Sequence, residues 1–251
     1  MAFDQSAFDA FQIIGAGRGG TSVLTGCIDK HPRCVAVLEA YSIPLLMGRV
    51  ENAHEEIAEF EPRVRARVEA FLNACRAAAA DHPGKLWGHK STTEQIHGLN
   101  LWRGAMVDDE GFDAIGHFIA RTAHLPTIYI VRDGRACVES KMRRANRPLD
   151  TSIASWKFSI SLLQRMRAAP TPLLIVKMED LVSNPEAELR RVAAFLRVDY
   201  DPVMLTGTAN TKMRAEYQQP GFNQSTRMPA NRNPPWIHRI AAELDYCGYA
   251  L

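Results

Sequence analysis

The sequence lacks any apolar run of membrane-spanning length and any pair of closely spaced cysteines. No window approaches the ~20 apolar residues of a transmembrane helix, and the N-terminal stretch has neither the basic region nor the apolar core of a secretory signal. The five cysteines are scattered and odd in number, which argues against a disulfide framework and against a zinc site. We therefore expect a cytoplasmic protein with reduced thiols, without a membrane partner and without a bound metal.

An excess of charge of either sign is also missing. The 251 residues include 30 Lys and Arg against 28 Asp and Glu, which gives a formal net charge of +2. Nucleic-acid binding normally requires a stronger basic bias, so we expect no nucleic-acid partner. The length suits one large α/β domain and leaves little room for a second core. We expect a single domain that spans residues 1–251.

The sequence does contain a glycine-rich stretch near its start, residues 11–25, which reads F-Q-I-I-G-A-G-R-G-G-T-S-V-L-T. A short apolar run enters a turn with four glycines, and the hydroxyls of Thr21 and Ser22 follow at the start of an apolar segment. Glycines let backbone N–H groups converge on an anion, and the first turn of a following helix adds unpaired donors and the positive end of its dipole. The stretch predicts a strand, a phosphate-binding loop and a helix N-terminus.

Two common nucleotide-binding patterns fit this loop incompletely. The triphosphate loop G-x-x-x-x-G-K-[ST] has its glycine spacing in Gly15 and Gly20, but Thr21 replaces the lysine and Arg18 is the cation of the loop. Without that lysine the charge that reaches the terminal phosphates is lost, which disfavours a P-loop kinase. The dinucleotide pattern G-x-G-x-x-G also matches, yet a pattern made only of glycines is weak. A glycine-rich turn without a ligand is the remaining interpretation.

Apolar runs alternate with helical periodicity along the chain. The predicted strands are 11–14, 33–38, 85–90, 126–131 and 172–178, and the predicted helices include 22–30, 136–144, 151–168, 183–196 and 236–246. This alternation predicts an α/β fold, a P-loop-type three-layer domain whose central parallel sheet of about five strands is flanked by helices. Residues 41–81 read as mostly helical, and 206–235 form a loop long enough to be functional or mobile.

A second group of polar residues follows the strongest predicted strand. Arg132 comes directly after residues 126–131, and Ser140 lies on the next helix, so the two side chains can meet an anion from two sides. The alternative for Arg132 is a local ion pair with Asp133. Because the carboxyl ends of parallel strands meet at one edge, the two anion sites together indicate a nucleotide with phosphates at both ends.

These pieces resemble the sulfotransferases that use 3′-phosphoadenosine 5′-phosphosulfate (PAPS), especially the bacterial and Golgi-type branches. Residues 15–32, G-A-G-R-G-G-T-S with its helix and H-P, are similar to the 5′-phosphosulfate loop of that family. Residues 128–140, I-Y-I-V-R-D-G-R-A-C-V-E-S, are similar to its 3′-phosphate motif. Residues 178–196 and 244–249 resemble later segments of the family. The first two pieces are the specific ones.

The resemblance implies which residues bind the cofactor. The 5′-phosphosulfate would be held by the loop residues Arg18, Gly19, Gly20, Thr21 and Ser22, where Gly19 replaces a serine that is usual in the family. The 3′-phosphate would be held by Arg132 and Ser140. Ser225, in N-Q-S-T, is similar to a further serine of the tyrosylprotein branch. Trp156 would face the adenine, or else it is a core aromatic on an amphipathic helix.

The resemblance also implies catalytic roles. Glu39 stands where the tyrosylprotein branch has its catalytic glutamate, and Lys90 resembles the lysine that neutralises the sulfuryl group together with Arg18. Sulfuryl transfer needs a base for the acceptor hydroxyl and positive donors around the moving group. His89 is a rival base. Because neighbouring side chains of a strand point to opposite faces, His89 and Lys90 cannot both enter the site, and we favour Lys90.

The sequence therefore predicts a PAPS-dependent sulfotransferase that acts on a hydroxyl acceptor, needs no metal and releases 3′-phosphoadenosine 5′-phosphate (PAP). A small molecule, a glycan and a tyrosyl group all remain open as acceptors, since no signature separates them. The alternatives are a P-loop kinase of a small metabolite and a nucleotide-binding module without catalysis, in which Glu39 would be dispensable.

Overall fold

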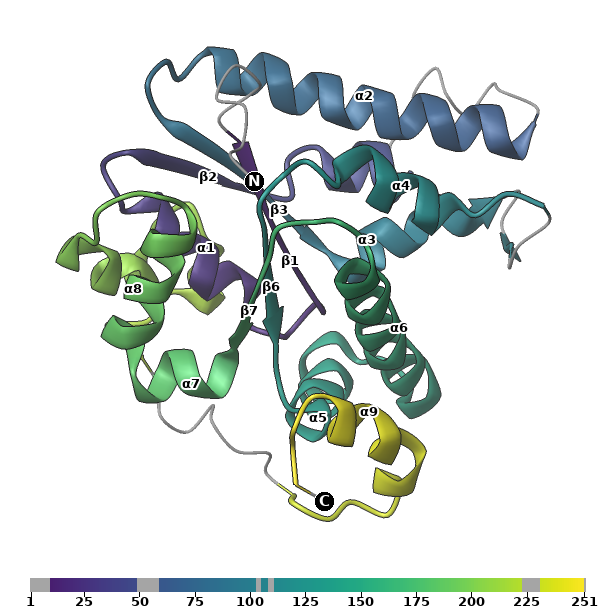
Figure 1. Cartoon of the computed structure of the whole chain (residues 1–251). Coiled ribbons are helices and arrows are strands. Elements are labelled where there is room, and N and C mark those ends of the chain that lie inside the picture. Colours follow the sequence, from purple (N-terminus) through teal and green to yellow (C-terminus); the bar gives the residue numbers. More distant parts are fainter. Residues whose placement is uncertain (1–9, 49–58, 103–104, 108–110, 223–230, 251) are drawn as a thin grey trace.

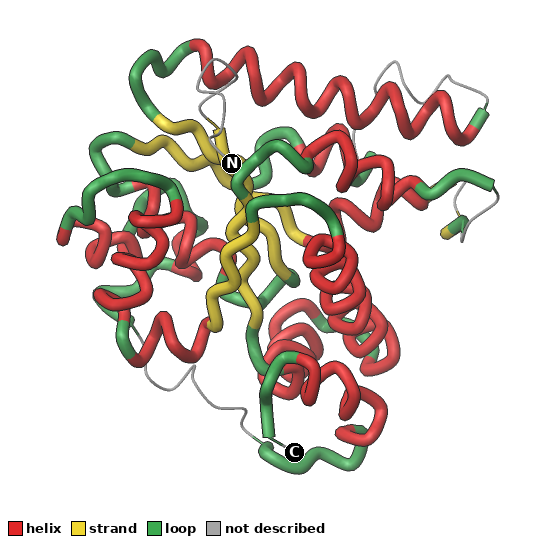
Figure 2. The backbone as a smooth tube through the Cα atoms, in the orientation of Figure 1, coloured by secondary structure: helices red, strands yellow, loops and turns green. Residues whose placement is uncertain are grey.

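A parallel sheet forms the centre of the computed structural model, which describes residues 10–48, 59–102, 105–107, 111–222 and 231–250. Its strands are β1 (Ala10–Gly15), β2 (Cys34–Leu38), β3 (Leu86–Thr92), β6 (Thr127–Val131) and β7 (Leu173–Lys177). The order across the sheet is β2-β3-β1-β6-β7, and every neighbouring pair is parallel (Figure 1, Figure 2). The α/β fold with a parallel sheet that the sequence predicts is thus confirmed.

Helices follow almost every strand. They are α1 (Thr21–Asp29), α2 (Phe60–Ala80), α3 (Thr93–His97), α4 (Ala114–Thr122), α5 (Gly134–Ala145), α6 (Leu149–Ala168), α7 (Met178–Ser183), α8 (Pro185–Phe195) and α9 (Ala241–Tyr246). Shorter turns of helix lie at Ser42–Leu46, Gly98–Asn100, Pro202–Ala209, Ala215–Tyr217 and Ile237–Ile240, and β4 (Leu101–Trp102) pairs with β5 (Ala105–Met106) in a separate antiparallel ladder. In the described part of the chain, no helix combines the length and the apolar character needed to cross a membrane.

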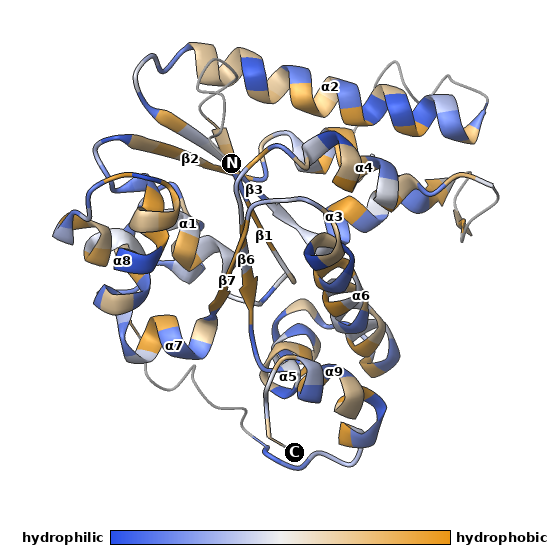
Figure 3. Cartoon of the chain, viewed as in Figure 1, coloured by the Kyte–Doolittle hydropathy of each residue, from blue (hydrophilic) through white to orange (hydrophobic). Residues whose placement is uncertain are grey.

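The helices bury both faces of the sheet. In Figure 1, α2, α3, α4 and α6 lie on one side of it, and α1, α7 and α8 lie on the other. Alternate residues of one strand feed the two cores: Tyr129 of β6 belongs to the first, and its neighbour Ile128 belongs to the second. Strands buried on both faces read as continuous apolar runs, which explains why β6, buried along its whole length, appears hydrophobic in Figure 3.

The structure differs from the sequence prediction in its short helices. One of them, α7, is not among the predicted elements. The six residues of α7 make less than two turns, too few for an apolar periodicity to show. The closing helix predicted at 236–246 begins as a turn of 3₁₀ helix at Ile237–Ile240 and becomes α-helical only from Ala241. These elements depend on tertiary packing more than on a local pattern.

The carboxyl ends of all five strands meet at one edge, as a parallel sheet requires. Glu39 follows β2, the glycine loop follows β1, Arg132 follows β6 and Met178 follows β7. The strand register sets their heights, since Leu38 of β2 pairs with Lys90 of β3. Residues that are far apart in the sequence are therefore placed side by side along this edge.

Close packing between neighbouring strands gives a test of the fold. A Cβ atom on Gly88 of β3 would lie 2.2 Å from Cζ of Phe11 on β1. We expect Gly88→Ala to lower the free energy of unfolding by about 1–3 kcal/mol, because the buried ring has to move. The control is Gly221→Ala, where an added Cβ meets no heavy atom within 4 Å. Urea unfolding measures the stability of both variants, and equal unfolding midpoints for the two would contradict this packing.

Candidate active site

A cleft of about 710 Å³ opens at the carboxyl edge of the sheet. Its walls come from the glycine loop, the start of α1, the ends of β2 and β3, α5, and the segment after residue 206. The predicted site residues that line it are Arg18, Gly20, Thr21, Ser22, Glu39, Lys90, Arg132 and Ser140. Of the other predicted residues, Gly19 and Trp156 are not in the lining, and Ser225 lies outside the described residues.

Two glycines explain the shape of the loop. A Cβ on Gly15 would lie 2.5 Å from the carbonyl oxygen of Ile130, so only glycine lets β1 end this close to β6. Gly20 has a φ of 95° and forms the N-cap of α1. No side chain caps that helix, and no acidic residue lies in its first turn. The backbone N–H groups of the first turn of α1 and the positive end of its dipole therefore face the cleft without a counter-charge from the helix itself.

A buried carboxylate braces the loop from below. Oε2 of Glu94 accepts a hydrogen bond from the Gly17 amide at 2.9 Å, and Oε1 accepts one from Ser155 Oγ at 2.8 Å and pairs with Lys141 Nζ. Burial alone would raise the pKa of Glu94, but the Lys141 ammonium and these hydrogen bonds outweigh it and hold the pKa at about 2. The ionised carboxylate thus fixes the direction of the Gly17 N–H. Glu94 is not among the site residues predicted from the sequence, and its partner Gly17 lies 77 positions away.

Arg18 joins the two predicted anion sites. Its φ of 71° is left-handed, and its Nε donates to Ser140 Oγ at 3.2 Å. Its Nη1 donates to the Tyr217 hydroxyl at 2.6 Å, and the guanidinium lies 4.9 Å from the centre of that ring. Arg132 Nη1 in turn donates to the Arg18 carbonyl oxygen at 3.0 Å. The loop arginine and the pair after β6 therefore form one connected cluster.

Tyr217 is a cleft residue that sequence reasoning missed. It lies on the turn Ala215–Tyr217, inside the long loop whose length suggested either function or mobility. Several residues of this loop line the cleft: Lys212, Met213, Arg214, Glu216, Tyr217 and Gln219. Nothing in the local sequence separates Tyr217 from other tyrosines, because its partner Arg18 is 199 positions away. The length of the loop was the available signal.

Glu39 and Lys90 form an ion pair in the lining of the cleft. Glu39 has a left-handed φ of 59°, and its amide donates to the Lys90 carbonyl oxygen at 3.0 Å. The Lys90 side chain is 3% exposed, whereas that of Glu39 is 24% exposed. Burial lowers the pKa of Lys90, and the attraction of the Glu39 carboxylate restores only part of it. A second anion near this ammonium would be strongly favoured.

His89 points away from the cleft, on the opposite face of β3. Its Nε2 accepts a hydrogen bond from the Tyr41 amide at 3.2 Å, and its ring packs edge-on against Phe71 with the centroids 5.1 Å apart. Burial and the nearby Lys90 charge lower the pKa of His89 to about 3. The rival base therefore lies in the core, and Lys90 is the member of the pair that reaches the cleft.

Trp156 also lies in the core and does not face the cleft. It is 1% exposed and packs beneath α5, where a Cβ on Gly134 would lie 2.7 Å from its ring. Its Nε1 donates to the Arg132 carbonyl oxygen at 3.2 Å. The adenine contact suggested for Trp156 is therefore corrected: the indole supports the backbone of Arg132. Asp133, the alternative partner of Arg132, pairs with Arg135 instead.

The cleft concentrates positive charge that the whole chain lacks. Its lining contains seven Lys or Arg residues against three Glu, while the chain as a whole has a net charge of +2. Arg143 and Arg144 of α5 stand beside Ser140 in the lining and make no hydrogen bond or ion pair within the described ranges. Among the described residues, no group of three or more His, Cys, Asp or Glu is arranged to hold a metal ion. The cleft suits an anion with several charges.

Comparison with protein families gives one decisive match, because the model of the Sulfotransferase family matches residues 11–202. The chain belongs to the sulfotransferase family. The matched residues include the glycine loop, Glu39, Lys90, Arg132 and Ser140. Comparison with curated protein sequences finds no match. The family thus rests on the sequence model and on the fold.

Solved structures with this fold are distant in sequence. The sulfotransferase domain from the curacin biosynthetic pathway is 15% identical over 98% of this chain and 100% of its own, with a TM-score of 0.68. The sulfotransferase domain from the Synechococcus PCC 7002 olefin synthase is 18% identical over 99% of this chain and 98% of its own, with a TM-score of 0.65. Mouse sulfotransferase SULT7A1 complexed with PAP is 10% identical over 95% of this chain and 86% of its own, with a TM-score of 0.50.

The Glu94 brace can be tested with two double variants that both remove its ion pair. Glu94→Gln with Lys141→Met keeps an amide oxygen for the Gly17 N–H, whereas Glu94→Leu with Lys141→Met removes the acceptor. Replacing both charges avoids a lone buried ion, so both variants are expected to fold. Losing the hydrogen bond that directs the loop should lower the affinity for adenosine 5′-phosphate by about tenfold, and only in the leucine variant. Calorimetry measures this, and equal affinities in the two variants would contradict the brace.

Proposed function

We propose that this sulfotransferase transfers a sulfuryl group from PAPS to a hydroxyl group of an acceptor, with the chain acting as one domain. The observation that carries the proposal is the cluster in which Arg18 of the phosphate loop contacts Ser140 while Arg132 contacts the Arg18 backbone. A nucleotide with a single phosphate group would not need two cationic sites at neighbouring strand ends. The mouse sulfotransferase of the same fold is complexed with PAP, and we extend that ligand to this chain.

The residues of the cleft fit such a nucleotide. The uncapped N-terminus of α1 supplies the amides of Thr21 and Ser22 for the 5′-phosphosulfate, and Arg18 supplies a charge. Arg132 and Ser140 would hold the 3′-phosphate, and the nearby Arg143 and Arg144 would raise the local potential. The bound PAPS supplies the activated sulfuryl group. The excess of cations over carboxylates in the lining supports a ligand with this many negative charges.

Glu39 and Lys90 supply the chemistry of transfer. Glu39 is the carboxylate that would take the proton of the acceptor hydroxyl, a role that contributes about 10²–10⁴-fold in typical enzymes. Lys90 holds that carboxylate in the cleft, and its buried ammonium can turn to the sulfuryl oxygens when they compete for it. The left-handed backbone of Glu39 supports this assignment, since strain of this kind concentrates at functional positions. A small molecule, a glycan and a tyrosyl group fit this chemistry equally.

Calorimetry with PAP and with ATP, each with and without magnesium, tests the nucleotide. We expect PAP to bind without metal and at least about tenfold more tightly than ATP, because Thr21 replaces the lysine that reaches terminal phosphates. Arg132→Ala should lower the affinity for PAP far more than the affinity for adenosine 5′-phosphate, which has no 3′-phosphate. A preference for Mg-ATP would instead indicate a P-loop kinase and would sink the proposal.

The role of Glu39 is tested by Glu39→Gln. We expect PAP affinity within about threefold of the wild type and a loss of about 10²–10⁴ in turnover, because the amide cannot accept the proton. PAP release from PAPS, with pooled phenolic, sugar and hydroxyalkyl acceptors, measures turnover. Glu216→Gln is the matched control, since that exposed carboxylate also lines the cleft but stands outside the proposed chemistry. A Glu39→Gln variant with full turnover would remove Glu39 as the base.

A further inference from the structure

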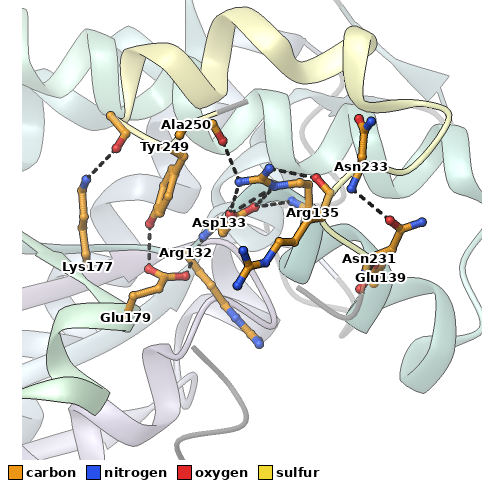
Figure 4. Close-up of polar contacts among 12 residues, drawn as sticks. Arg132, Asp133, Arg135, Glu139, Lys177, Glu179, Asn231, Asn233, Tyr249 and Ala250 are labelled. Atoms are coloured by element: carbon orange, nitrogen blue, oxygen red, sulfur yellow. Dashed lines mark hydrogen bonds and ion pairs between the residues drawn. The ribbon is translucent and has the colours of Figure 1, made fainter. Parts of the chain in front are cut away.

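The C-terminal segment, residues 231–250, lies against the turn that carries Arg132 (Figure 4). The match to the Sulfotransferase family ends at residue 202, so this segment lies outside the matched region. Nevertheless, it contacts Arg135 and Glu139 in the first turns of α5, and Glu179 in the first turn of α7. These contacts surround the site that we assign to the 3′-phosphate.

The direction of the Arg132 side chain depends on how its backbone is held. On one side, its carbonyl oxygen accepts a hydrogen bond from Trp156 Nε1. On the other side, the amide of Asp133 donates to Glu179 Oε1 at 2.9 Å. Arg132 follows the last residue of β6, so these two bonds, together with its own bond to the Arg18 carbonyl, set its position in the cleft.

Tyr249 completes the carboxylate end of this arrangement. Its hydroxyl donates to Glu179 Oε2 at 2.8 Å, so both oxygens of Glu179 are engaged, one by the turn and one by the C-terminal segment. Lys177 Nζ lies 4.8 Å from the centre of the Tyr249 ring and donates to the Gly248 carbonyl oxygen at 3.4 Å. The phenol is thereby fixed from two sides, as Figure 4 shows.

Arg135 ties the same turn to both ends of the C-terminal segment. Its guanidinium forms a buried pair with Asp133, with Nη2 2.7 Å from Oδ2. The remaining donors reach the carbonyl oxygens of Arg232 and Ala250, each at 3.0 Å. One turn further along α5, Glu139, which precedes Ser140, accepts a hydrogen bond at its Oε1 from the Asn231 amide at 3.2 Å. The neighbour of Ser140 is thus bonded to this segment directly, and Asp133, the neighbour of Arg132, is connected to it through Arg135 and Glu179.

We propose that the C-terminal segment is a positioning element of the subsite for a nucleoside 3′-phosphate, in which Tyr249 acts through Glu179 to fix Arg132. The inference rests on the proposed function, because it assumes that Arg132 holds the 3′-phosphate. Tyr249 does not line the cleft among the described residues, and so it acts through the turn.

Tyr249→Phe tests the proposal because it removes a single hydroxyl. Adenosine 3′-phosphate and adenosine 5′-phosphate are titrated separately into the full chain by calorimetry. We expect the variant to bind adenosine 3′-phosphate about three- to tenfold more weakly than the wild type, in line with the loss of one hydrogen bond. Its affinity for adenosine 5′-phosphate should stay within about twofold of the wild type. A general loss of structure would weaken both nucleotides, so the difference between them reports the positioning role.

Tyr246→Phe is the matched control from the same segment. The Tyr246 hydroxyl accepts a hydrogen bond from Arg167 at 3.1 Å, away from the Arg132 turn, so this variant should bind both nucleotides as the wild type does. A second variant, Arg135→Lys, keeps a charge for Asp133 and breaks the bonds to the two carbonyl oxygens. It should again lower the affinity for adenosine 3′-phosphate and leave the affinity for adenosine 5′-phosphate unchanged.

Two results would overturn the inference: equal weakening of both nucleotides by Tyr249→Phe, or unchanged binding of the 3′-phosphate. A wild-type protein that binds adenosine 5′-phosphate but neither adenosine 3′-phosphate nor PAP would instead show that the proposed function itself fails, and the inference with it.

Discussion

The parallel register of the sheet is the constraint on which the whole site depends. Only parallel strands deliver their carboxyl ends to one edge, and here that edge collects a glycine loop, a carboxylate and an arginine from three different strands. The pairing of Leu38 with Lys90 brings the ammonium of β3 beside the carboxylate that follows β2. A shift of one residue in β3 would turn Lys90 into the core and His89 toward the cleft, because side chains alternate between the faces.

Two ion pairs of different burial lie along this edge, one beneath the glycine loop and one in the lining of the cleft. Glu94 and Lys141 form a pair beneath the loop, where the carboxylate directs an amide. Glu39 and Lys90 form a pair inside the cleft, where the more exposed carboxylate can reach an acceptor. A buried pair of this kind is weak evidence for stability, since removing two charges from water costs about as much as their attraction returns. Orientation is the better explanation for both pairs.

Much of the fold and part of the site could be predicted from local sequence. The glycine loop, the strand before Arg132 and the hydroxyl of Ser140 are short-range patterns, and the alternation along β3 correctly separates Lys90 from His89. The failures involve partners far apart in sequence. Trp156 was open as a ligand contact or as a core residue, because helical periodicity does not say what covers a helix face. Glu94, Tyr217 and Tyr249 gain their roles from residues 77, 199 and 70 positions away.

The bond between Arg18 and Ser140 shows how two phosphate sites can act as one. In this structure the loop arginine is held by the hydroxyl of the neighbouring site and by Tyr217. On the proposed function, the Ser140 hydroxyl accepts from Arg18 and can at the same time donate its own O–H to the 3′-phosphate. A phosphate that accepts this O–H makes the oxygen a better acceptor for Arg18, because hydrogen bonds in a chain polarise one another. A nucleotide with both phosphates engages this chain at both ends, whereas a ligand with one phosphate engages only one end.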